Sequence, residues 1–421
     1  MIKLAYLCSE YPSRSHTFIR REIHELRRRG ASIDVYAIRR PKQKDLISEL
    51  DIQEFNNTVS ILPADVFTLT LVHLKMFFAH PLRYLKTLKT AFGHHLPGLK
   101  NTLWALFQFV EGILLAHHLQ QKPVQHLHVH FANSGASVGM VAANYLGLSW
   151  SMTLHGTSCF DYPWGPLLGK KLENCTFANC ISYFGLSQAY RAVAPKHWHK
   201  LFVSRCGIEL AAVNRAKEKL ANEIKLNPHK KDAPIRLISV GRLHIEKGYP
   251  VMMEAFNTAL KTVPNMELML LGDGPYRAEL EAFVKEKGIE KNVIFKGAVP
   301  EQTVLDEMAY ADIFALSSFM EGVPMVLMEA MILEVPVIAP RVAGIPELVI
   351  DKENGLLFDP ARAQQMAEQI VELAQDAKKR AKYSAAGRGK VLAEFTIEKG
   401  VEKLWQRFSL LGADAANYNE G

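Results

Sequence analysis

The chain has little cysteine and no long uninterrupted hydrophobic run. Its five cysteines among 421 residues form no Cys-x-x-Cys pair and leave one thiol over in any pairing scheme, which favours a reducing compartment. Charged residues such as Asp65, Lys75 and Glu111 interrupt the best candidates for the roughly eighteen apolar residues that a membrane-spanning helix needs. The segment before Glu10 has too short an apolar run to resemble a signal peptide. We therefore expect a cytoplasmic protein with no membrane-spanning part.

Two nucleotide-binding signatures are incomplete in the second half of the chain. The loop after the apolar segment 235–241 carries Arg242 and Lys247 but lacks the glycine and the Gly-Lys-Ser/Thr spacing of a Walker A loop. The turn 272–275 reads Gly-Asp-Gly-Pro and lacks the final glycine of a dinucleotide fingerprint. These gaps argue against a P-loop NTPase and make a dehydrogenase a weak interpretation.

The distribution of charge divides the chain into two parts. The net charge of +7 consists of +11 over residues 1–205 and −4 over the rest, and 14 of the 16 histidines fall in the first part. A length of 421 residues favours two or three domains, and 48% hydrophobic with 22% charged residues is ordinary for a globular protein. We expect two domains with different partners, one of them anionic, and no nucleic-acid partner.

The first half begins with the pattern of a doubly wound α/β sheet. An apolar strand over 2–7 precedes a helix over 17–30, and a second strand begins at Val35. The loop between the first strand and the helix contains Ser15 and His16 and lies where such sheets bind ligands, so both residues are binding candidates. A plain loop with a helix-capping serine or threonine explains the same residues equally well.

Histidines mark two further strands. His126, His128 and His130 alternate along a strand over 126–131. A structural role is favoured over a metal site, because no further cluster of histidine, cysteine and carboxylate residues completes a set of ligands nearby. The next strand ends in His155 beside a glycine, at the sheet edge where α/β proteins collect functional groups. A structural hydrogen bond at a strand end is the alternative for His155.

The region from 66 to 119 is helical and apolar. Within it, leucines and basic residues alternate at a spacing of three: Leu82, Leu85 and Leu88 against Arg83, Lys86 and Lys89. Such a basic amphipathic helix could dock the region 66–101 on an anionic membrane surface. A basic solvated face on helices that pack a domain core is the commoner explanation locally, while the charge asymmetry of the chain favours docking.

The strand and helix pattern continues to the C-terminus and predicts the domain boundaries. Further strands of the first half are expected over 180–186 and 201–205, and helices over 364–373 and 397–410 close the chain. The second half alternates strands with helices and so predicts a separate parallel sheet, with strands in 235–241, 266–271, 293–295, 313–316, 337–338 and 355–358. The expected divisions are a first domain over 1–207, a linker over 208–234, a second domain over 235–395, and a C-terminal helix and tail over 396–421.

Two loops of the second half are expected to meet. The loop with Arg242 and Lys247 and a helix start near Val323 both follow strands of one parallel sheet, so both should open on the same crevice. Pro324 suits a first helical position, and Gly322 allows a close backbone approach. The helix N-terminus and the two cations suit a diphosphate.

Two carboxylates, Glu321 and Glu329, flank this anion site. Because they repel a bare phosphate, the ligand should also carry hydroxyl groups for their oxygens to bind, as a nucleotide-sugar does. The Glu-x7-Glu spacing alone proves little, since acid pairs at any chosen separation arise by chance. The assignment of the two glutamates to a binding site therefore depends on the motifs around them.

Taken together, these motifs resemble the retaining glycosyltransferases of family four. The matching segments are Val240-Gly241-Arg242 with Lys247-Gly248, Gly272-Asp273-Gly274-Pro275, Glu321 to Glu329, Ala343-Gly344-Ile345-Pro346-Glu347, Asn354-Gly355-Leu356-Leu357 and His155-Gly156. The resemblance covers nearly the whole chain, and His130-Phe131 with the region 12–19 is similar to members that build bacterial exopolysaccharides of the colanic-acid type and lipid-linked sugar chains. It implies the GT-B fold, in which two Rossmann-like doubly wound domains face each other across a cleft and the C-terminal helix returns to the first.

The resemblance also implies roles for individual residues. In the donor site, Arg242 and Lys247 bind the diphosphate, Glu329 the ribose and Glu321 the sugar, beside Gly274, Gly322, Val323 and Pro324. His155 is implied to bind a sugar hydroxyl near the reacting carbon, so His155 and Glu321 are the catalytic candidates, and Ser15 and His16 become the acceptor candidates. The first loop departs from the family because it lacks paired glycines, and Ala343 stands where a glycine is frequent.

The implied reaction transfers a hexose from a nucleoside-diphosphate sugar to a hydroxyl of a glycan or lipid-linked acceptor, with retention and without a metal or other cofactor. A UDP-sugar is the favoured donor, with GDP-mannose as the alternative. We prefer a front-face reaction, with Glu321 as a binder, over a covalent intermediate on Glu321. The rival interpretations are a nucleotide-sugar epimerase or phosphorylase, and a non-catalytic binding module. The expected location is cytoplasmic, with peripheral contact to the inner membrane face.

Overall fold

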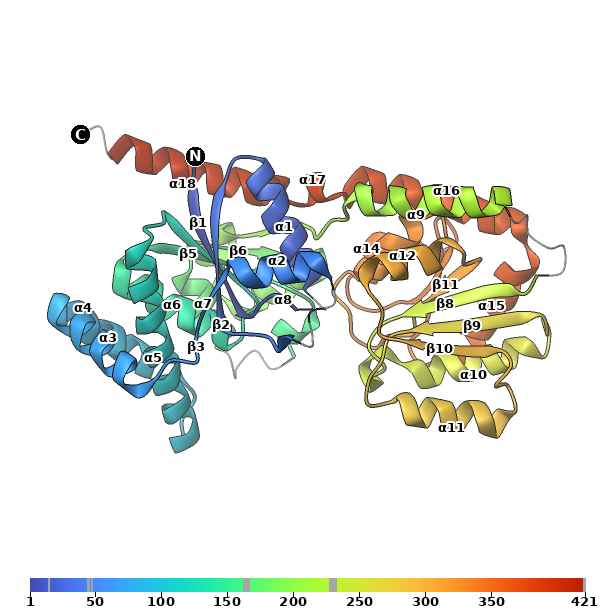
Figure 1. Cartoon of the computed structure of the whole chain (residues 1–421), viewed down its shortest axis with the longest axis horizontal. Coiled ribbons are helices and arrows are strands. Elements are labelled where there is room, and N and C mark those ends of the chain that lie inside the picture. Colours follow the sequence, from blue (N-terminus) through green and yellow to red (C-terminus); the bar gives the residue numbers. More distant parts are fainter. Residues whose placement is uncertain (14–15, 44–45, 47, 162–166, 227–232, 419–421) are drawn as a thin grey trace. The chain divides into compact units, whose positions relative to one another are not determined.

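A computed structural model describes residues 1–13, 16–43, 46, 48–161, 167–226 and 233–418 of the chain. The chain divides into two compact units, Met1–Arg205 with Gly400–Gly421, and Cys206–Lys399. Each unit is built on its own sheet of parallel strands alternating with helices, as the sequence pattern predicted (Figure 1). Within the described ranges, no helix combines the length and apolar character needed to cross a bilayer.

The first unit contains a seven-stranded sheet in the order β3-β2-β1-β4-β5-β6-β7. Its strands are β1 (Lys3–Glu10), β2 (Ser32–Arg39), β3 (Thr58–Leu62), β4 (His126–His130), β5 (Ser149–Leu154), β6 (Phe177–Cys180) and β7 (Leu201–Val203). Its helices are α1 (Thr17–Arg28), α2 (Glu49–Asn57), α3 (Val66–Ala79), α4 (Pro81–Gly93), α5 (Leu99–Gln121), α6 (Ser134–Leu146), α7 (Leu168–Asn174), α8 (Tyr183–Ala192) and α18 (Glu402–Tyr418). The strand order reverses between β1 and β4, so the loops after these two strands lie where doubly wound sheets bind ligands.

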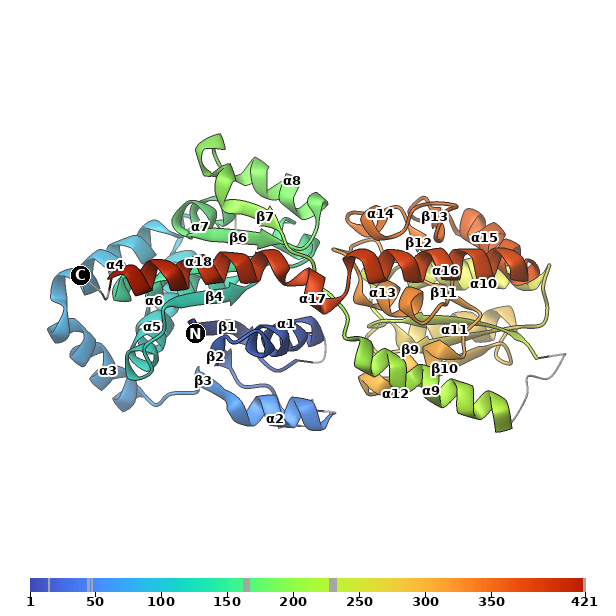
Figure 2. The ribbon, with the colours of Figure 1, turned by 90° about the horizontal axis from the view of Figure 1, so that it is seen from above.

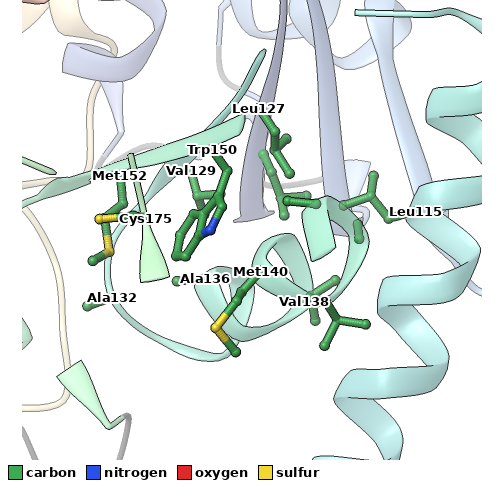
Figure 3. Packing of buried hydrophobic residues seen from close by; sticks show 14 of the residues in the cluster. Leu115, Leu127, Val129, Ala132, Ala136, Val138, Met140, Trp150, Met152 and Cys175 are labelled. Carbon is green, nitrogen blue, oxygen red and sulfur yellow. The ribbon is translucent and has the colours of Figure 1, made fainter. Parts of the chain in front are cut away.

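Successive residues of β1 point to opposite faces of this sheet. Ala5 and Leu7 pack into a hydrophobic core shared with β4, β5, α5 and α6. Figure 3 shows part of this core, with Trp150 of β5 and Met140 of α6 among its buried side chains. Tyr6 lies on the opposite face, where it meets α1 and α18 through Glu22 and a ring of the C-terminal helix.

The C-terminal helix α18 packs on this second face of the first unit. Phe408 is fully buried, and its ring centroid lies 5.3 Å from that of His128 and 5.7 Å from that of Phe177. An ion pair of 2.6 Å joins Arg29 of the segment after α1 to Glu402 at the start of α18. Figure 2 shows α18 running along β4. Its contacts therefore group α18 with the first unit.

The second unit contains a six-stranded sheet in the order β10-β9-β8-β11-β12-β13. Its strands are β8 (Ile235–Val240), β9 (Met266–Leu271), β10 (Val293–Gly297), β11 (Ile313–Ala315), β12 (Val337–Pro340) and β13 (Leu356–Phe358). Its helices are α9 (Leu210–Leu226), α10 (Tyr249–Leu260), α11 (Arg277–Lys287), α12 (Glu301–Ala309), α13 (Met325–Ile332), α14 (Ile345–Leu348), α15 (Ala363–Gln375), α16 (Ala377–Glu394) and α17 (Ile397–Gly400). Leu237 and Ile238 of β8 enter two different cores, so helices cover both faces of this sheet. The order reverses at β8 and β11, which places the second ligand-binding edge there.

Two segments of the chain differ from the sequence prediction. The strand expected over 180–186 is wrong beyond Cys180, because the Ser182 side chain accepts a hydrogen bond from the Gly185 N–H and starts α8. The segment expected as a linker over 208–234 instead contains α9, whose Val213 and Ala216 are buried against the second unit. Its many charged residues belong to the exposed side of that helix.

The C-terminal helices also differ in number from the prediction. The helix expected over 364–373 is α15, but α16 was not expected at all. Its few buried positions, such as Tyr383 and Val391, are separated by lysine, arginine and glycine, so the apolar periodicity is weak. The single helix expected over 397–410 is two helices, α17 and α18.

Candidate functional site

The donor candidates lie on two loops of the second unit that leave neighbouring strands. Because β8 and β11 pair in parallel, the loop after β8 and the loop after β11 emerge at the same edge of the sheet. The Ser317 hydroxyl donates a hydrogen bond of 2.9 Å to the Lys247 carbonyl, and the Phe319 N–H donates one of 2.8 Å to the Glu246 carbonyl. The expected convergence of the two loops is confirmed.

A glycine fixes the direction of the first loop. Gly248 has a φ of 62°, and a Cβ added there would lie 2.0 Å from the Ser317 carbonyl oxygen. A side chain at this position would therefore strain the backbone and push the loops apart. Gly248 thus holds Lys247 against the loop that follows β11.

Lys247 and Glu321 form a short charge pair at this edge. Lys247 Nζ donates to Glu321 Oε1 at 2.6 Å, and the two side chains are only 29% and 10% exposed. The ammonium offsets the cost of burying the carboxylate. Since an ammonium has three donors, the pair leaves N–H groups of Lys247 for a ligand anion. The sequence assigned these residues to different parts of a ligand, and the structure brings them into direct contact.

Arg242 is held more loosely than Lys247. Its side chain is 65% exposed, and its Nη2 lies 3.8 Å from Glu246 Oε2. Because an exposed pair at this distance contributes about 0–1 kcal/mol, the guanidinium can turn toward a ligand phosphate at little cost. Its planar fork of donors suits such an oxyanion.

Helix α13 begins two residues later than the sequence predicted. It starts at Met325, and Pro324 is its N-cap with an extended backbone, so the expected start near Val323 is wrong. No side chain caps this helix, because proline offers no acceptor at the N-cap position. No capping side chain therefore competes with a ligand for the N–H groups of the first turn.

The backbone around Gly322 is closely packed. A Cβ on Gly344 would lie 2.3 Å from the Gly322 carbonyl oxygen, so the loop before α14 presses on the loop before α13. Ala343 has a φ of 44°, a conformation that favours glycine, which is the residue frequent there in the resembling family. The alanine therefore occupies this turn at some cost in strain.

The other two donor candidates have different surroundings. Glu329 lies one turn into α13 and is buried. Gly274 lies against the first loop, where an added Cβ would be 2.3 Å from the Leu243 carbonyl oxygen. The packing of the turn 272–275 on the β8 loop therefore accounts for this glycine without a ligand.

In the first unit, His155 ends β5 inside a cluster of rings. Its Nε2 and the Nδ1 of His130 lie 2.8 Å apart and share one proton in a hydrogen bond. The rings of Phe18 and Phe131 lie 4.5 and 4.9 Å from its centroid. Burial, followed by the charges of His130 and His16, holds the pKa of His155 well below its ordinary value. A neutral imidazole can hydrogen-bond a sugar hydroxyl but supplies no positive charge.

A buried carboxylate that the sequence reasoning missed lies next to His130. Glu22 Oε1 lies 3.6 Å from His130 Nε2 and accepts a hydrogen bond of 2.9 Å from the Tyr6 hydroxyl. Burial raises the pKa of Glu22 to about 7, against the opposing effect of the Tyr6 hydrogen bond. The signal was present in the sequence, since Glu22 follows Ile19 by three residues and precedes Leu26 by four, on the apolar face of α1.

Glu22, His128 and His130 also form a cluster of metal-ligating groups, with ligand atoms within 4.8 Å of one another. The expectation that no carboxylate completes such a cluster is therefore wrong. However, the two nitrogens of His128 lie 2.7 and 2.9 Å from the hydroxyls of Ser151 and Thr153. An ion would have to displace one hydroxyl, so the donor set does not fit a metal as it stands. These hydroxyls satisfy the buried ring and support a structural role.

Of the two acceptor candidates, Ser15 lies outside the described residues. His16 precedes α1, and its ring centroid lies 5.2 Å from that of Phe131. Burial lowers the pKa of His16, so this ring is also neutral. Phe131 contacts both His16 and His155, and the structure therefore brings these two candidates into one cluster.

The two units together define the class of protein. The GT-B fold consists of two doubly wound units of parallel strands, and both units of this chain have that architecture. The crystal structure of Anabaena Alr3699/HepE in complex with UDP-glucose matches the chain with a TM-score of 0.70 at 17% identity, covering 97% of this chain and 100% of that one. The predicted GT-B fold is confirmed.

Sequence comparisons find known glycosyltransferases that are similar to this chain, above all in its second unit. Residues 221–390 match the family model described as Glycosyl transferases group 1. The amylovoran biosynthesis glycosyltransferase AmsK of Erwinia amylovora is 32% identical over 206 residues, which are 47% of this chain and 50% of that protein. The putative colanic acid biosynthesis glycosyltransferase WcaL of Escherichia coli (strain K12) is 31% identical over 183 residues, 42% of each. The chain thus spans about half the length of these relatives. Its second unit is similar to group 1 glycosyltransferases, and the resemblance predicted from the motifs is confirmed.

Proposed function

We propose that the chain is a retaining glycosyltransferase. It moves a hexose from a nucleoside-diphosphate sugar to a hydroxyl of a glycan or lipid-linked acceptor during the synthesis of a cell-surface polysaccharide. The observation that carries this proposal is the convergence of Lys247, Glu321 and the N-terminus of α13 at one sheet edge of a unit similar to group 1 glycosyltransferases. The cation and the helix end suit a diphosphate, while the carboxylates suit sugar hydroxyls.

The second unit supplies its own electrostatic stabilisation of the leaving group. As the sugar bond breaks, negative charge grows on the diphosphate, and Arg242, Lys247 and the dipole of α13 face that charge. These groups take the part that a divalent cation plays elsewhere, so we propose transfer without a metal or other cofactor. Glu329 binds the ribose hydroxyls.

Glu321 acts as a binder of the sugar rather than as a nucleophile. Its carboxylate is already paired with Lys247 at 2.6 Å, and this pairing weakens its attack on the anomeric carbon. In the front-face reaction, the leaving phosphate oxygen instead takes the proton of the acceptor hydroxyl. His155, which is neutral, orients a sugar hydroxyl near the reacting carbon.

A panel of nucleotides tests the donor proposal. Thermal unfolding is measured with uridine, guanosine and adenosine diphosphates and with their sugars, because a ligand that binds only the folded state raises the melting temperature. UDP-sugars are expected to stabilise most, since a solved structure of the same fold holds UDP-glucose. Stabilisation by GDP-mannose instead would show that the donor nucleotide contains guanine rather than uracil. Stabilisation by none of these ligands would contradict the proposal that this edge binds a nucleotide-sugar.

Variants test the roles at the same site. Glu329→Ala should remove stabilisation by the donor, whereas Glu321→Ala and His155→Ala should remove transfer. Glu353→Ala changes an exposed carboxylate and is the matched control. A hexose trapped on Glu321, detected by intact-protein mass spectrometry, would establish the covalent route instead. An isomerised donor or free sugar formed without acceptor would indicate an epimerase or phosphorylase, and donor binding without turnover would indicate a binding module.

We further propose a cytoplasmic enzyme that contacts the anionic inner membrane face through α3 and α4. Large apolar side chains are exposed on these helices beside basic ones: Val66, Phe67, Phe78, Leu82 and Leu85 beside Arg83, Lys86 and Lys89. Apolar insertion and attraction to anionic lipid act together on such a surface. Sedimentation with anionic liposomes should fall with salt and with the double substitution Leu82→Ser and Leu85→Ser. Liposome association that changes neither with salt nor with the double substitution would rule this contact out.

A further inference from the structure

A cavity of about 480 Å³ lies in the first unit, among α5, α6, α7 and the segment that follows α4. Its volume is that of a small-molecule site. One part of its wall is polar, with Lys171, His94 and Ser134, and another is formed by the rings of Trp104 and Phe131. None of these residues belongs to the proposed donor site.

Lys171 is a buried cation without a counter-ion. Its side chain is fully buried, and its Nζ donates to the carbonyls of Ala132 and Asn133 at 2.7 and 2.9 Å. No carboxylate of the described residues pairs with this ammonium. Burial lowers the pKa of Lys171 to about 7. Keeping such a group buried is costly unless an anion joins it, because an unpaired charge loses its hydration.

A second positive feature lies at the same place. The carbonyls that Lys171 binds directly precede α6, so the ammonium lies at the N-terminus of a 13-residue helix. That end of the helix carries partial positive charge and favours an anion, although the Asn133 side chain already accepts a hydrogen bond from the Gly135 N–H. The described residues that line the cavity include no aspartate or glutamate that could neutralise the ammonium or the helix end.

His94 adds an unpaired donor to the wall. It is more than nine-tenths buried, and its Nε2 has no hydrogen-bond partner among the described residues. Burial, followed by the charges of Lys171 and Lys170, lowers the pKa of His94 to about 3, so its ring is neutral. A neutral ring at this position can donate one N–H to a ligand oxygen.

We infer that this cavity binds the phosphate group of a phosphoester, held by Lys171, His94 and the N-terminus of α6, with an apolar part of the ligand against Trp104. The donors come from three elements, namely α7, the segment after α4 and the start of α6, and together they can bind several oxygens of a phosphate. The Gln108 amide, which donates 2.8 Å to the Ser134 hydroxyl, extends this polar wall. The cavity is larger than a phosphate alone, and Trp104 borders the remaining space.

One ring of the cavity wall contacts both the acceptor candidate His16 and the catalytic candidate His155. Phe131 lines it, and the same ring lies 4.9 Å from that of His155. A phosphoester bound here would contact the Phe131 ring that packs against His155, as expected of an acceptor that carries a phosphate. This last identification rests on the proposed function, whereas the phosphate site itself does not.

Binding of a water-soluble short-chain prenyl phosphate to the full chain, measured by titration calorimetry, tests the site. Lys171→Met should weaken this binding at least tenfold, while Lys100→Met, which removes an exposed lysine of α5, should change it less than twofold. Equal affinity of the wild type and Lys171→Met would overturn the inference. Where Lys171→Met fails to fold, Ala105→Phe fills the cavity and keeps the lysine, and it should weaken binding to a similar extent.

Two further arms separate this site from the donor site and identify the source of the phosphate. Lys247→Met should bind the prenyl phosphate as the wild type does. If Lys247→Met lost this binding while Lys171→Met kept it, the prenyl phosphate would bind at the donor site, and the inference would be overturned. Tighter binding of the prenyl phosphate than of inorganic phosphate, with the gain lost in Trp104→Ala, supports the site with a lipid phosphate as its ligand. Equal affinities that both depend on Lys171 support it with a free phosphate. Because the readout is binding, a failure of transfer activity would leave these results unaffected.

Discussion

The two sheet edges of this protein use opposite electrostatic arrangements. In the second unit, charged side chains such as Lys247 and Glu321 pair in loops that remain partly open to solvent. In the first unit, the edge holds buried, uncharged imidazoles such as His130 and His155, packed among aromatic rings. A nucleotide can thus be held by paired charges, while a sugar hydroxyl needs only neutral donors and acceptors whose positions are fixed by packing.

Lowering the pH should have the largest effect on stability, and this effect should fall on the first unit. Burial lowers the pKa of His94, His126 and His130 to about 3, from about 6.5 in an unfolded chain. Below pH 6.5 these histidines bind protons in the unfolded chain but not in the folded unit, so the free energy of unfolding falls as the pH falls from 6.5 toward 3. The pKa of Glu22 is raised to about 7, so between pH 7 and 4.5 the folded unit binds a proton that the unfolded chain does not, and this offsets the effect of one of the three histidines. These four groups alone give a net loss of about 3 kcal/mol for each pH unit between 6.5 and 4.5, and His128 and His155, whose pKa values are also lowered by burial, act in the same direction.

Tryptophan fluorescence can follow this loss in the first unit alone. The four tryptophans among the described residues, Trp104, Trp150, Trp198 and Trp405, belong to the first unit, and the fifth, Trp164, lies within the sequence range of that unit. In urea titrations at pH 7 and pH 5.5, the fluorescence midpoint should fall sharply, while the circular dichroism should retain a later transition from the second unit. His126→Gln should make the dependence of stability on pH less steep, because it removes one of the buried imidazoles with a lowered pKa. Equal shifts of both transitions would break the contrast between the units.

Removing the ring that α18 contributes should produce the next largest effect. Phe408 is fully buried against the rings of Tyr6, His128 and Phe177. Phe408→Ala should therefore lower the free energy of unfolding of the first unit by about 3–5 kcal/mol, through lost burial and a cavity. The same fluorescence titration measures it, and Leu410→Ala, at an exposed position of α18, is the control. A loss below about 1 kcal/mol would mean that α18 does not stabilise the sheet face that carries His128.

The sequence predicted the second unit better than the first for a physical reason. Loop charges such as Arg242 and Lys247 follow a strand at short offsets, so their convergence with Glu321 could be inferred from the strand order alone. The contact between Lys247 and Glu321 could not, because it depends on Gly248 and Ser317 packing.

In the first unit, the sequence identified His155 and the alternation of the neighbouring histidines. It did not reveal that Glu22 meets His130 or that Phe18 meets His155, because each of these contacts joins residues more than a hundred positions apart. It also missed the cavity around Lys171, since a lysine in a short, charged helix is ordinarily a solvated residue. Burial of single polar groups is a property of tertiary packing, which local patterns do not record.

Breaking the charge pair of the second unit should affect transfer more than stability. Lys247→Met removes a cation that we propose faces the leaving diphosphate, and the rate of transfer should then fall about 10²–10³-fold, as for other groups that stabilise a developing negative charge. The double variant Lys247→Met and Glu321→Gln should regain stability, because it no longer buries an unpaired carboxylate, yet it should not regain transfer. Initial rates and melting temperatures of the wild type and of both variants decide this. Full transfer by Lys247→Met would show that Arg242 and α13 suffice.

The smallest effect is expected from the ion pair between Arg29 and Glu402. Its atoms lie 2.6 Å apart, but Glu402 is 49% exposed and Arg29 also pairs with Glu25 at 2.8 Å. Water screens such a pair and Glu25 keeps the arginine in place, so Glu402→Gln should lower the free energy of unfolding by only about 0.5 kcal/mol. Fluorescence-detected urea titrations in low and in high salt measure the difference, which should vanish in high salt. A loss as large as that of Phe408→Ala, or one that persists in high salt, would show that charge rather than ring packing attaches α18 to the first unit.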